Sequence, residues 1–167
     1  MSVRIRPATA GDAAALSAFA AETFHVTYAA FNTAENMTAY TDATFSPAQQ
    51  RVEIEDASGF VLLAVDDSEI VGYAQIAPGH GALEIKRFYI ALTQHGRGVA
   101  QLLMDAVEVS AAARGAGALW LSVWERNPRA IAFYRKMRFV ETGITTFELG
   151  SETQRDLLMV RPLTSRP

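Results

Sequence analysis

Hydrophobic residues follow a helical spacing in the first third of the chain and a strand-like spacing after it. Leu16, Phe19 and Ala20 fall at positions i, i+3 and i+4. They follow Thr9 and Asp12, whose three-residue spacing resembles a capping box at a helix start. Asn32-Thr33 and Ser46-Pro47 are two further signals of a helix start, so we expect this third of the chain to be mostly helical. The expected elements are a strand at Val3–Arg6 closed by Pro7, then helices from Thr9 to about Tyr28, from Asn32-Thr33 and from Ser46-Pro47.

The rest of the chain alternates strands with two more helices. The turn residues 66–69 separate two apolar runs and predict a hairpin. The strand at 119–124 alternates little, which is typical of a strand buried on both faces. The expected strands are Phe60–Val65, Ile70–Ala77, Leu83–Ala91, Leu119–Trp124, Phe139–Leu149 and Leu157–Val160, and the expected helices run from Gly98 to about Ala113 and onward from Asn127-Pro128.

The order of these elements predicts the fold class. A strand, a helix and a strand over residues 83–124 form one parallel crossover, whereas the neighbouring strands are joined as antiparallel hairpins. We therefore expect an α+β fold with a mixed, mostly antiparallel central sheet and helices on both faces. The sequence has no repeat, low-complexity tract or linker, so a single domain over residues 1–167 is predicted.

Composition excludes several kinds of site. The chain has no Cys, which excludes a disulfide framework and a thiol nucleophile. Its three histidines, His25, His80 and His95, lack the spacing of a helical metal pair, so we expect no metal site. The net charge of -3 and the absence of a basic run argue against a nucleic-acid partner.

Hydropathy indicates where the protein works. The longest apolar run, Phe60–Val65, is far shorter than the roughly 20 residues of a membrane span. The first residues, Met1–Pro7, lack the apolar stretch of a signal peptide. We therefore expect a cytoplasmic protein with no membrane partner.

The segment Gln94-His95-Gly96-Arg97-Gly98 joins a predicted strand to a predicted helix. Two glycines let the backbone approach a ligand, and the free N–H groups of a first helical turn attract phosphate. An isolated Gly-x-Gly is also common in tight turns that bind nothing. The spacing matches neither a dinucleotide-binding fingerprint nor a P-loop.

Further segments give this loop a context. Leu83–Ile90 precedes it, and Trp120–Asn127 with Ala130–Tyr134 follow it. Together these segments resemble the GNAT superfamily of acetyl-CoA-dependent N-acetyltransferases, over about residues 60–160. Thr33–Tyr40, Ala43–Phe45, Gly143 and Asp156–Met159 further resemble the bacterial polyamine N-acetyltransferase branch. The resemblance implies the GNAT fold, with a sheet of about seven strands.

The resemblance also implies how acetyl-CoA, the expected co-substrate, is bound. Backbone groups of Phe88, Tyr89 and Ile90 would bind the pantetheine arm and the acetyl carbonyl, and Asn127 would touch the arm. The pyrophosphate would lie on the amides of the loop and of the first helical turn. These are the amides of His95, Gly96, Arg97, Gly98, Val99 and Ala100.

Two positions depart from the family pattern. His95 stands where many members have Gln or Arg, which removes a permanent charge that Arg97 can replace. Arg138 stands where the family usually has Gly. If its backbone is left-handed, a residue other than Gly costs roughly 1–2 kcal/mol there.

Tyr134 is the predicted general acid. It follows Asn127 by seven residues, so both lie on one side of a helix. When an amine attacks a thioester, the leaving thiolate needs a proton or a strong hydrogen bond, which a phenol can give. Its alternative role is packing in the core, which we assign to Phe133.

Glu84 is the candidate base, because an alkyl amine with a pKa near 10.4 must lose a proton before attack. With period 2, Glu84 would share a strand face with Lys86, Phe88 and Ile90. A surface pair of Glu84 with Lys86 is the alternative, as is deprotonation through water. An acceptor pocket could be lined by carboxylates and aromatic faces, which bind ammonium groups. Its candidate residues are Phe24, Tyr28, Glu35, Tyr40 and Asp42.

Together these observations predict an enzyme that acetylates a primary amine by direct attack, with a polyamine as the favoured small-molecule acceptor. A protein N-terminus, a lysine and an aminoglycoside are alternative acceptors. A non-catalytic acyl-CoA sensor and a nucleotide-binding protein are alternatives of another class. Monomer and homodimer both remain open.

Overall fold

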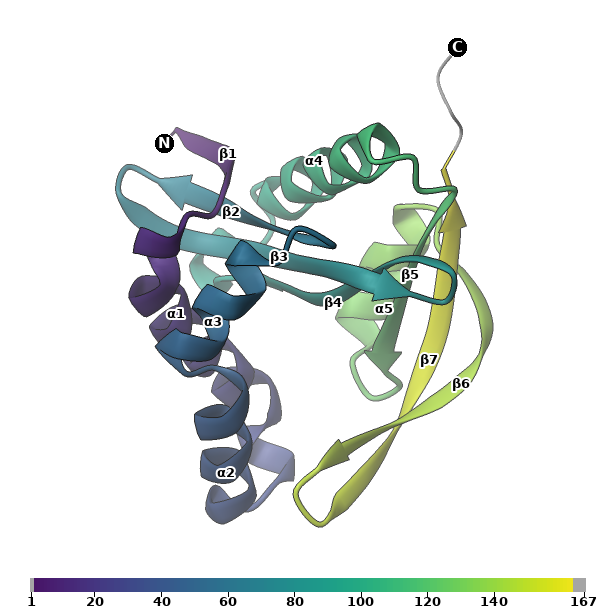
Figure 1. Cartoon of the computed structure of the whole chain (residues 1–167). Helices are drawn as coiled ribbons and strands as arrows, with labels where there is room; N and C mark the ends of the chain where they lie inside the picture. Colours follow the sequence, from purple (N-terminus) through teal and green to yellow (C-terminus); the bar gives the residue numbers. More distant parts are fainter. Residues whose placement is uncertain (1, 164–167) are drawn as a thin grey trace.

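The computed structural model describes residues 2–163, which form one central sheet with helices on either side (Figure 1). The strands are β1 (Val3–Pro7), β2 (Phe60–Asp66), β3 (Glu69–Gly79), β4 (Ala82–Ile90), β5 (Ala118–Trp124), β6 (Val140–Leu149) and β7 (Glu152–Pro162). The helices are α1 (Ala13–Tyr28), α2 (Ala34–Thr44), α3 (Pro47–Glu55), α4 (Val99–Ala113) and α5 (Pro128–Lys136), with short 3₁₀ turns at Ala10–Asp12, Ala29–Phe31 and Leu92–Gln94.

The sheet has seven strands in the order β1-β2-β3-β4-β5-β7-β6. All neighbours are antiparallel except β4 and β5, which the α4 crossover joins in parallel. The mixed α+β fold with helices on both faces is confirmed, as is the position of the parallel crossover.

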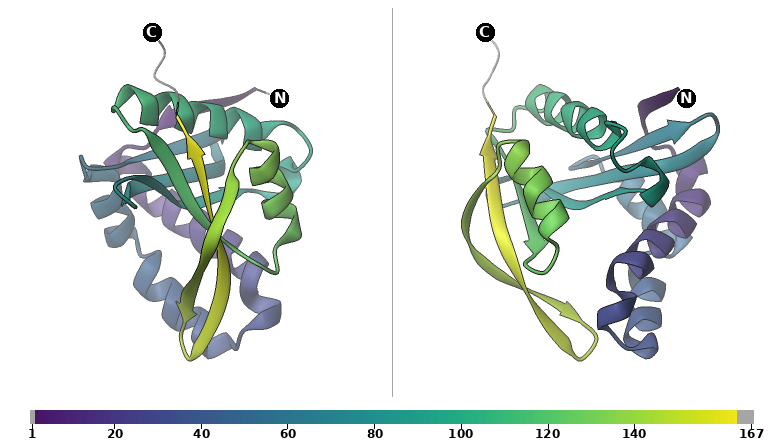
Figure 2. Two further views of the ribbon diagram at one scale, coloured as in Figure 1. Left: turned by 90° about the vertical axis from the view of Figure 1, so that its right-hand side faces the viewer. Right: turned by 180° about the vertical axis from the view of Figure 1, so that it is seen from behind.

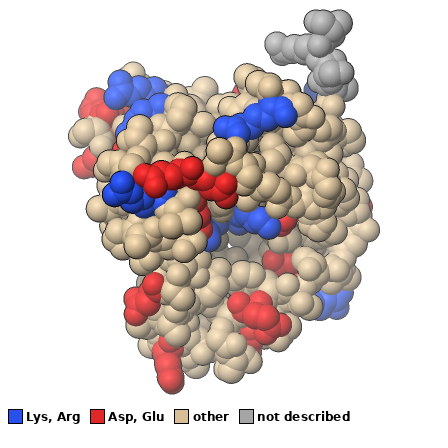
Figure 3. Space-filling view, in the orientation of Figure 1, with Lys and Arg blue, Asp and Glu red and all other residues tan. Residues whose placement is uncertain are grey.

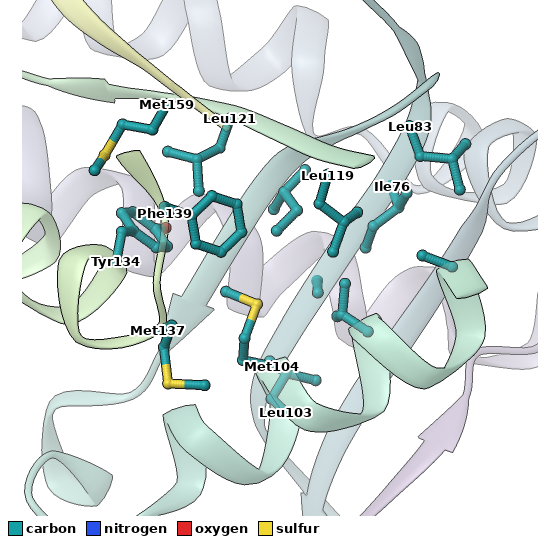
Figure 4. Packing of buried hydrophobic residues seen from close by; sticks show 14 of the residues in the cluster. Ile76, Leu83, Leu103, Met104, Leu119, Leu121, Tyr134, Met137, Phe139 and Met159 are labelled. Carbon is teal, nitrogen blue, oxygen red and sulfur yellow. The ribbon is translucent and has the colours of Figure 1, made fainter. Parts of the chain in front are cut away.

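Each face of the sheet carries its own hydrophobic core. One core lies under α4 and α5 and contains Leu103, Leu119, Leu121 and Met159 (Figure 4). The other core lies under α1, α2 and α3, with Phe24, Met37 and Phe45 among its residues. The ribbon views show the two helical layers separated by the sheet (Figure 2).

Local signals fix most helix starts. Thr9 and Asp12 form the expected capping box, although α1 proper begins only at Ala13 because the first turn is 3₁₀. The Thr33 and Ser46 side chains cap α2 and α3 by accepting backbone N–H bonds from Asn36 and Gln49. At the end of α5, Arg138 is left-handed with φ 71°, so the expected strain at this position is present.

The strands β4 and β5 are paired over only a short distance. Their register covers Leu83–Ile85 against Leu119–Leu121, although β4 continues to Ile90 and β5 to Trp124. Beyond Ile85 the two strands separate, so that edge of β4 turns unpaired backbone groups toward an opening in the middle of the sheet.

A bulge in β4 changes which side chains face which core. Gln75 pairs with Arg87, but Ile76 pairs with Ile85, so Lys86 is an extra residue in the strand. Leu83, Ile85 and Phe88 therefore all pack on the α4–α5 side. The prediction that Glu84 shares a face with Phe88 and Ile90 is wrong, because the extra residue reverses the alternation.

Two strand predictions also need correction. β7 begins at Glu152 rather than near Leu157, because its polar first half pairs with β6 as regularly as its apolar second half. β5 is not buried on both faces, because Ser122 on its second face is exposed. Within residues 2–163, no helix is long and apolar enough to cross a membrane.

Candidate active site

A cavity of about 760 Å³ lies where β4 and β5 separate. Its walls come from both cores. Phe88 and Tyr134 line it from the α4–α5 side, and Tyr28 and Tyr40 line it from the α1–α2 side. The cavity therefore passes through the opening in the sheet. Figure 3 shows the molecule hollowed near the middle of one face, with acidic and basic side chains around the hollow.

The glycine loop forms one end of this cavity. Gly96 and Gly98 have φ values of 77° and 80°, and Gly98 is the N-cap of α4. A Cβ at either glycine would meet no heavy atom within 4 Å, so glycine is needed for the backbone conformation and not for space. The first N–H groups of a helix lack intrahelical partners and attract anions. The loop therefore fits a pyrophosphate.

Most of the predicted loop residues line the cavity. They are His95, Gly96, Gly98, Val99 and Ala100. Arg97 is exposed and is not among the lining residues. Nε2 of His95 lies 3.1 Å from the carbonyl oxygen of Ile90, so this side chain ties the loop to the end of β4.

The open edge of β4 forms the adjoining wall. Phe88, Tyr89 and Ile90 pair with β3 on one side, and all three line the cavity. Since β5 has separated from them, backbone groups on the cavity side can bind the amides of an extended ligand, as a neighbouring strand would.

Tyr134 of α5 lies at the same wall, close to Phe139 (Figure 4). Its ring makes an edge contact with Phe88 at a centroid distance of 6.2 Å, and the residue is only 8% exposed. Burial raises the pKa of Tyr134 well above its ordinary value, so the phenol keeps its proton at neutral pH and can donate it. Asn127 also lines the cavity, but its Oδ1 accepts the N–H of Ala130 and thereby caps α5.

Aromatic side chains surround the other end of the cavity. Tyr28 contacts Phe24 at a centroid distance of 4.5 Å and Trp124 at 5.2 Å. Tyr40 stacks on Phe24 at 4.6 Å and meets Phe147 edge-on. These contacts join α1 and α2 to β5 and β6. The tips of α2 and the β6–β7 hairpin also meet, where Asn36 Nδ2 donates to Ser151 Oγ at 3.4 Å.

A buried carboxylate lies among these aromatic rings. Asp156 of β7 is 6% exposed and lines the cavity. Burial raises its pKa to about 6, the nearby Glu125 carboxylate adds to the rise, and a hydrogen bond from Ser122 opposes it. The same charge contributes to a raised pKa of about 12 at Tyr28, where burial is the main cause and a hydrogen bond with Tyr89 acts against it.

The sequence matches the model of the acetyltransferase (GNAT) family over residues 22–139. The chain belongs to the GNAT family. An uncharacterized N-acetyltransferase of Mycobacterium tuberculosis (strain H37Rv) is 37% identical over 153 residues, covering 91% of this chain and 98% of that protein. Streptothricin acetyltransferase of Streptomyces lavendulae is 32% identical over 123 residues, covering 70% of this chain and 65% of that protein.

The structure agrees with this assignment. The PaiA N-acetyltransferase from Thermoplasma acidophilum, solved in complex with coenzyme A, matches with a TM-score of 0.80 at 21% identity, covering 97% of this chain and 99% of that one. The GNAT fold expected from the sequence is thus confirmed. The protein is an enzyme, an N-acetyltransferase of the GNAT type.

Within this GNAT enzyme, the structure separates the predicted acceptor residues into two groups. Phe24, Tyr28 and Tyr40 line the cavity together. Glu35 and Asp42 are exposed on α2 and are not among the lining residues. A helix can direct only one side inward, and in α2 that side carries Met37 and Tyr40.

Glu84, the predicted base, lies away from the cavity. It is not a lining residue, and its Oε2 accepts a hydrogen bond from Lys86 Nζ at 2.9 Å and lies 3.6 Å from His80 Nε2. It also pairs in register with Trp120, on which His80 stacks. These contacts are those of the surface-pair alternative.

Asp156 was not among the residues expected in the site. Its neighbours Glu152–Arg155 are all polar, and such a run is typical of a loop. Without alternating polar and apolar residues, the sequence did not indicate which side chain points inward. The available signal was an acidic residue immediately before the apolar Leu157–Met159. Within residues 2–163, no group of three or more potential ligands is placed to hold a metal ion.

Proposed function

We propose that the enzyme transfers the acetyl group of acetyl-CoA to a primary amine by direct attack while both substrates are bound. The observation that carries this proposal is that one continuous cavity joins the glycine loop and the open edge of β4 to the aromatic compartment around Asp156. We call the first part the donor end and the second the acceptor end. A thioester and an amine bound at the two ends would meet in the opening of the sheet.

At the donor end, the pyrophosphate would lie on the first turn of α4, beside Gly96 and Gly98. The pantetheine arm would extend along Phe88–Ile90, with N–H groups of β4 polarising the thioester carbonyl and stabilising the oxyanion that forms on attack. The chain has no Cys, so the acetyl group cannot pass through a cysteine intermediate. The rate would come mainly from holding the two reactants in the correct geometry.

Tyr134 would assist the leaving group. As the C–S bond breaks, its hydroxyl donates a hydrogen bond or proton to the sulfur. Transfer from a phenol of pKa about 10 to a thiolate whose conjugate acid has a pKa near 8.5 is uphill by roughly 2 kcal/mol. The raised pKa of Tyr134 increases that difference, which favours a strong hydrogen bond in the transition state over complete transfer.

The favoured acceptor is a polyamine such as spermidine. Aromatic faces and a buried carboxylate attract an alkylammonium group, and the acceptor end supplies both through Tyr28, Tyr40 and Asp156. Streptothricin is a second candidate, because a relative that is 32% identical over 70% of the chain is named for its acetylation.

The test is release of thiol from acetyl-CoA with spermidine, spermine, streptothricin, lysine peptides and aminoglycosides as acceptors. We expect saturable turnover of at least one amine. Y134F should lower kcat about 100-fold with unchanged acetyl-CoA affinity, at the lower end of the usual range for loss of general acid catalysis. Y73F is the matched control, because Tyr73 is buried but does not line the cavity. Equal kcat values for Y134F and wild type would contradict the role of Tyr134, whereas binding of acetyl-CoA without turnover of any amine would support the acyl-CoA sensor.

A further inference from the structure

Asp156 is a buried carboxylate without a countercharge. The residue is 6% exposed, and within residues 2–163 no Lys, Arg or His side chain forms an ion pair with it. Its Oδ1 is buried and has no hydrogen-bond partner in this part of the chain. A buried charge without a partner is costly, and such groups persist where a ligand supplies the missing charge.

The surroundings of Asp156 show which ligand fits. Tyr28, Tyr40 and Phe147 line the same end of the cavity. An ammonium group on an alkyl chain satisfies this arrangement, because the carboxylate takes the charge and the rings contact the chain and its cation.

Asp156 is also connected to the reaction centre. The Tyr28 hydroxyl responds to the Asp156 charge and shares a hydrogen bond with Tyr89. Tyr89 belongs to the open edge of β4, where the thioester carbonyl would lie. We propose that Asp156 binds the ammonium group of the acceptor and removes the proton that must leave before attack, the role predicted for Glu84. This inference rests on the proposed acetyl transfer to a primary amine.

The protons balance in this scheme. The acceptor enters as R–NH₃⁺ and gives one proton to the Asp156 carboxylate. Its nitrogen then forms a bond to the thioester carbon, and the C–S bond breaks. The second proton lost from nitrogen accounts for the one that the sulfur gains through Tyr134. Asp156 returns its proton to solvent, so the products are the acetamide, the free thiol and one proton.

The electrostatic environment suits a base. The groups facing Asp156 are Tyr28 from α1, Ser122 from β5 and Glu125 just after β5, and Glu125 itself pairs with Arg155 at 3.6 Å. Burial, and to a smaller extent the Glu125 carboxylate, raise the pKa of Asp156 to about 6 against the opposing hydrogen bond from Ser122. Relative to an ordinary aspartate of pKa about 3.9, this makes it a stronger proton acceptor by roughly a hundredfold while it remains ionised at pH 7.

The first experiment measures kcat/KM for the amine against pH in wild type, D156N, D156E and E152Q. Asparagine keeps the shape of the side chain and removes the charge. At pH 7 we expect kcat/KM of D156N to be at least about 100-fold lower than that of wild type. The decrease in kcat/KM that wild type shows as pH falls through about 6 should be absent in D156N. Instead, kcat/KM of D156N should rise about tenfold per pH unit toward pH 9 as free amine accumulates. D156E should regain part of the rate. E152Q, exposed on the same strand, should match wild type.

The second experiment measures binding without turnover. Hexylammonium is titrated into the coenzyme A complexes of wild type and D156N by calorimetry, with hexan-1-ol as the neutral probe. Wild type should bind hexylammonium at least 20-fold more tightly than D156N does, and the two proteins should bind hexanol and coenzyme A equally. Equal coenzyme A affinity also shows that D156N is folded.

The outcomes separate the two proposals. If the enzyme turns over an amine and kcat/KM of D156N is within threefold of wild type, the role of Asp156 is wrong and the acetyl transfer stands. The same holds if D156N keeps the wild-type pH dependence near pH 6. Binding of hexylammonium that depends on Asp156, without turnover of any amine in the panel, supports the ammonium site and contradicts the proposed function. If the wild type neither binds hexylammonium nor turns over any amine, both are wrong.

Discussion

The donor end of the cavity is built mainly from backbone, whereas the acceptor end is built from side chains. At the donor end, two left-handed glycines, the first turn of α4 and the open edge of β4 present peptide groups. At the acceptor end, aromatic rings from α1, α2 and β6 enclose one carboxylate from β7. Backbone recognition depends on conformation, so it should be sensitive to glycine substitution. Side-chain recognition should be sensitive to the loss of single rings or charges.

Replacing Gly98 should damage the donor end most strongly. In G98V a β-branched residue must adopt φ near 80°, which is strongly unfavourable. We expect KM for acetyl-CoA to rise about 30-fold, because a shift of the loop worth roughly 2 kcal/mol removes its aligned amides. G117V is the control, since Gly117 is equally open and has no positive φ. Equal effects of the two changes would refute a conformational role for Gly98.

Removing one ring should damage the acceptor end alone. Y28A eliminates contacts with Phe24 and Trp124 and opens the wall beside Asp156. We expect KM for the amine to rise about tenfold, in line with loss of roughly 1–2 kcal/mol of ring contact. Acetyl-CoA affinity, measured by calorimetry, should not change. F31A is the control, because Phe31 is 57% exposed and packs on Trp124 without lining the cavity.

The contributions of Asp156 and Asp12 to the free energy of unfolding should change with pH in opposite directions. The folded-state pKa of Asp156 is raised to about 6, so the fold binds this proton more tightly than the unfolded chain does, and wild type gains stability as pH falls from 7 to 4. D156N should therefore be more stable than wild type at pH 8, by about 1–2 kcal/mol. That advantage should disappear near pH 4.

For Asp12, hydrogen bonds from Arg6, at 2.8 Å to each oxygen, hold the pKa well below its ordinary value. Its contribution to stability is therefore present above pH 4 and lost as pH falls below it. D12N should be less stable than wild type at pH 7 by about 1 kcal/mol. Urea unfolding at pH 2, 4, 6 and 8 measures both variants, and a parallel pH dependence of the two would contradict this assignment.

The smallest expected effect lies outside both ends. Arg138 is left-handed with φ 71° and follows α5, so R138G should raise the free energy of unfolding by about 1 kcal/mol. Thermal unfolding should show a midpoint about 2–4 °C higher, with kcat unchanged. K136G, within α5, should lower stability instead, because helical φ gives glycine no advantage there.

The same contrast explains how far the sequence could predict the molecule. The donor end and the helix starts depend on local signals, such as Gly96, Gly98 and the caps Thr33 and Ser46. The acceptor end depends on which residues meet after folding. The sequence suggested Tyr28 and Tyr40, but not that Asp156 lines the same cavity, because the polar start of β7 has no alternating pattern.

Glu84 shows the other limit of prediction. Its placement followed from strict period 2, and the single extra residue at Lys86 reverses that period. A bulge depends on how β3 and β4 pair rather than on a short motif, so residue order alone did not reveal it.

The bulge at Lys86 has a consequence for insertions and deletions in this region. The extra residue reverses the alternation along the strand. The odd-numbered Leu83 and Ile85 before it face the same core as the even-numbered Phe88 after it. Deleting Lys86 would place Arg87 next to Ile85 and restore strict alternation, so Phe88 would still face the α4–α5 core and Tyr89 the core under α1–α3. The pairing with β3 therefore decides which side chains of β4 face each core, and the extra residue between Ile85 and Arg87 changes the local bend of the strand.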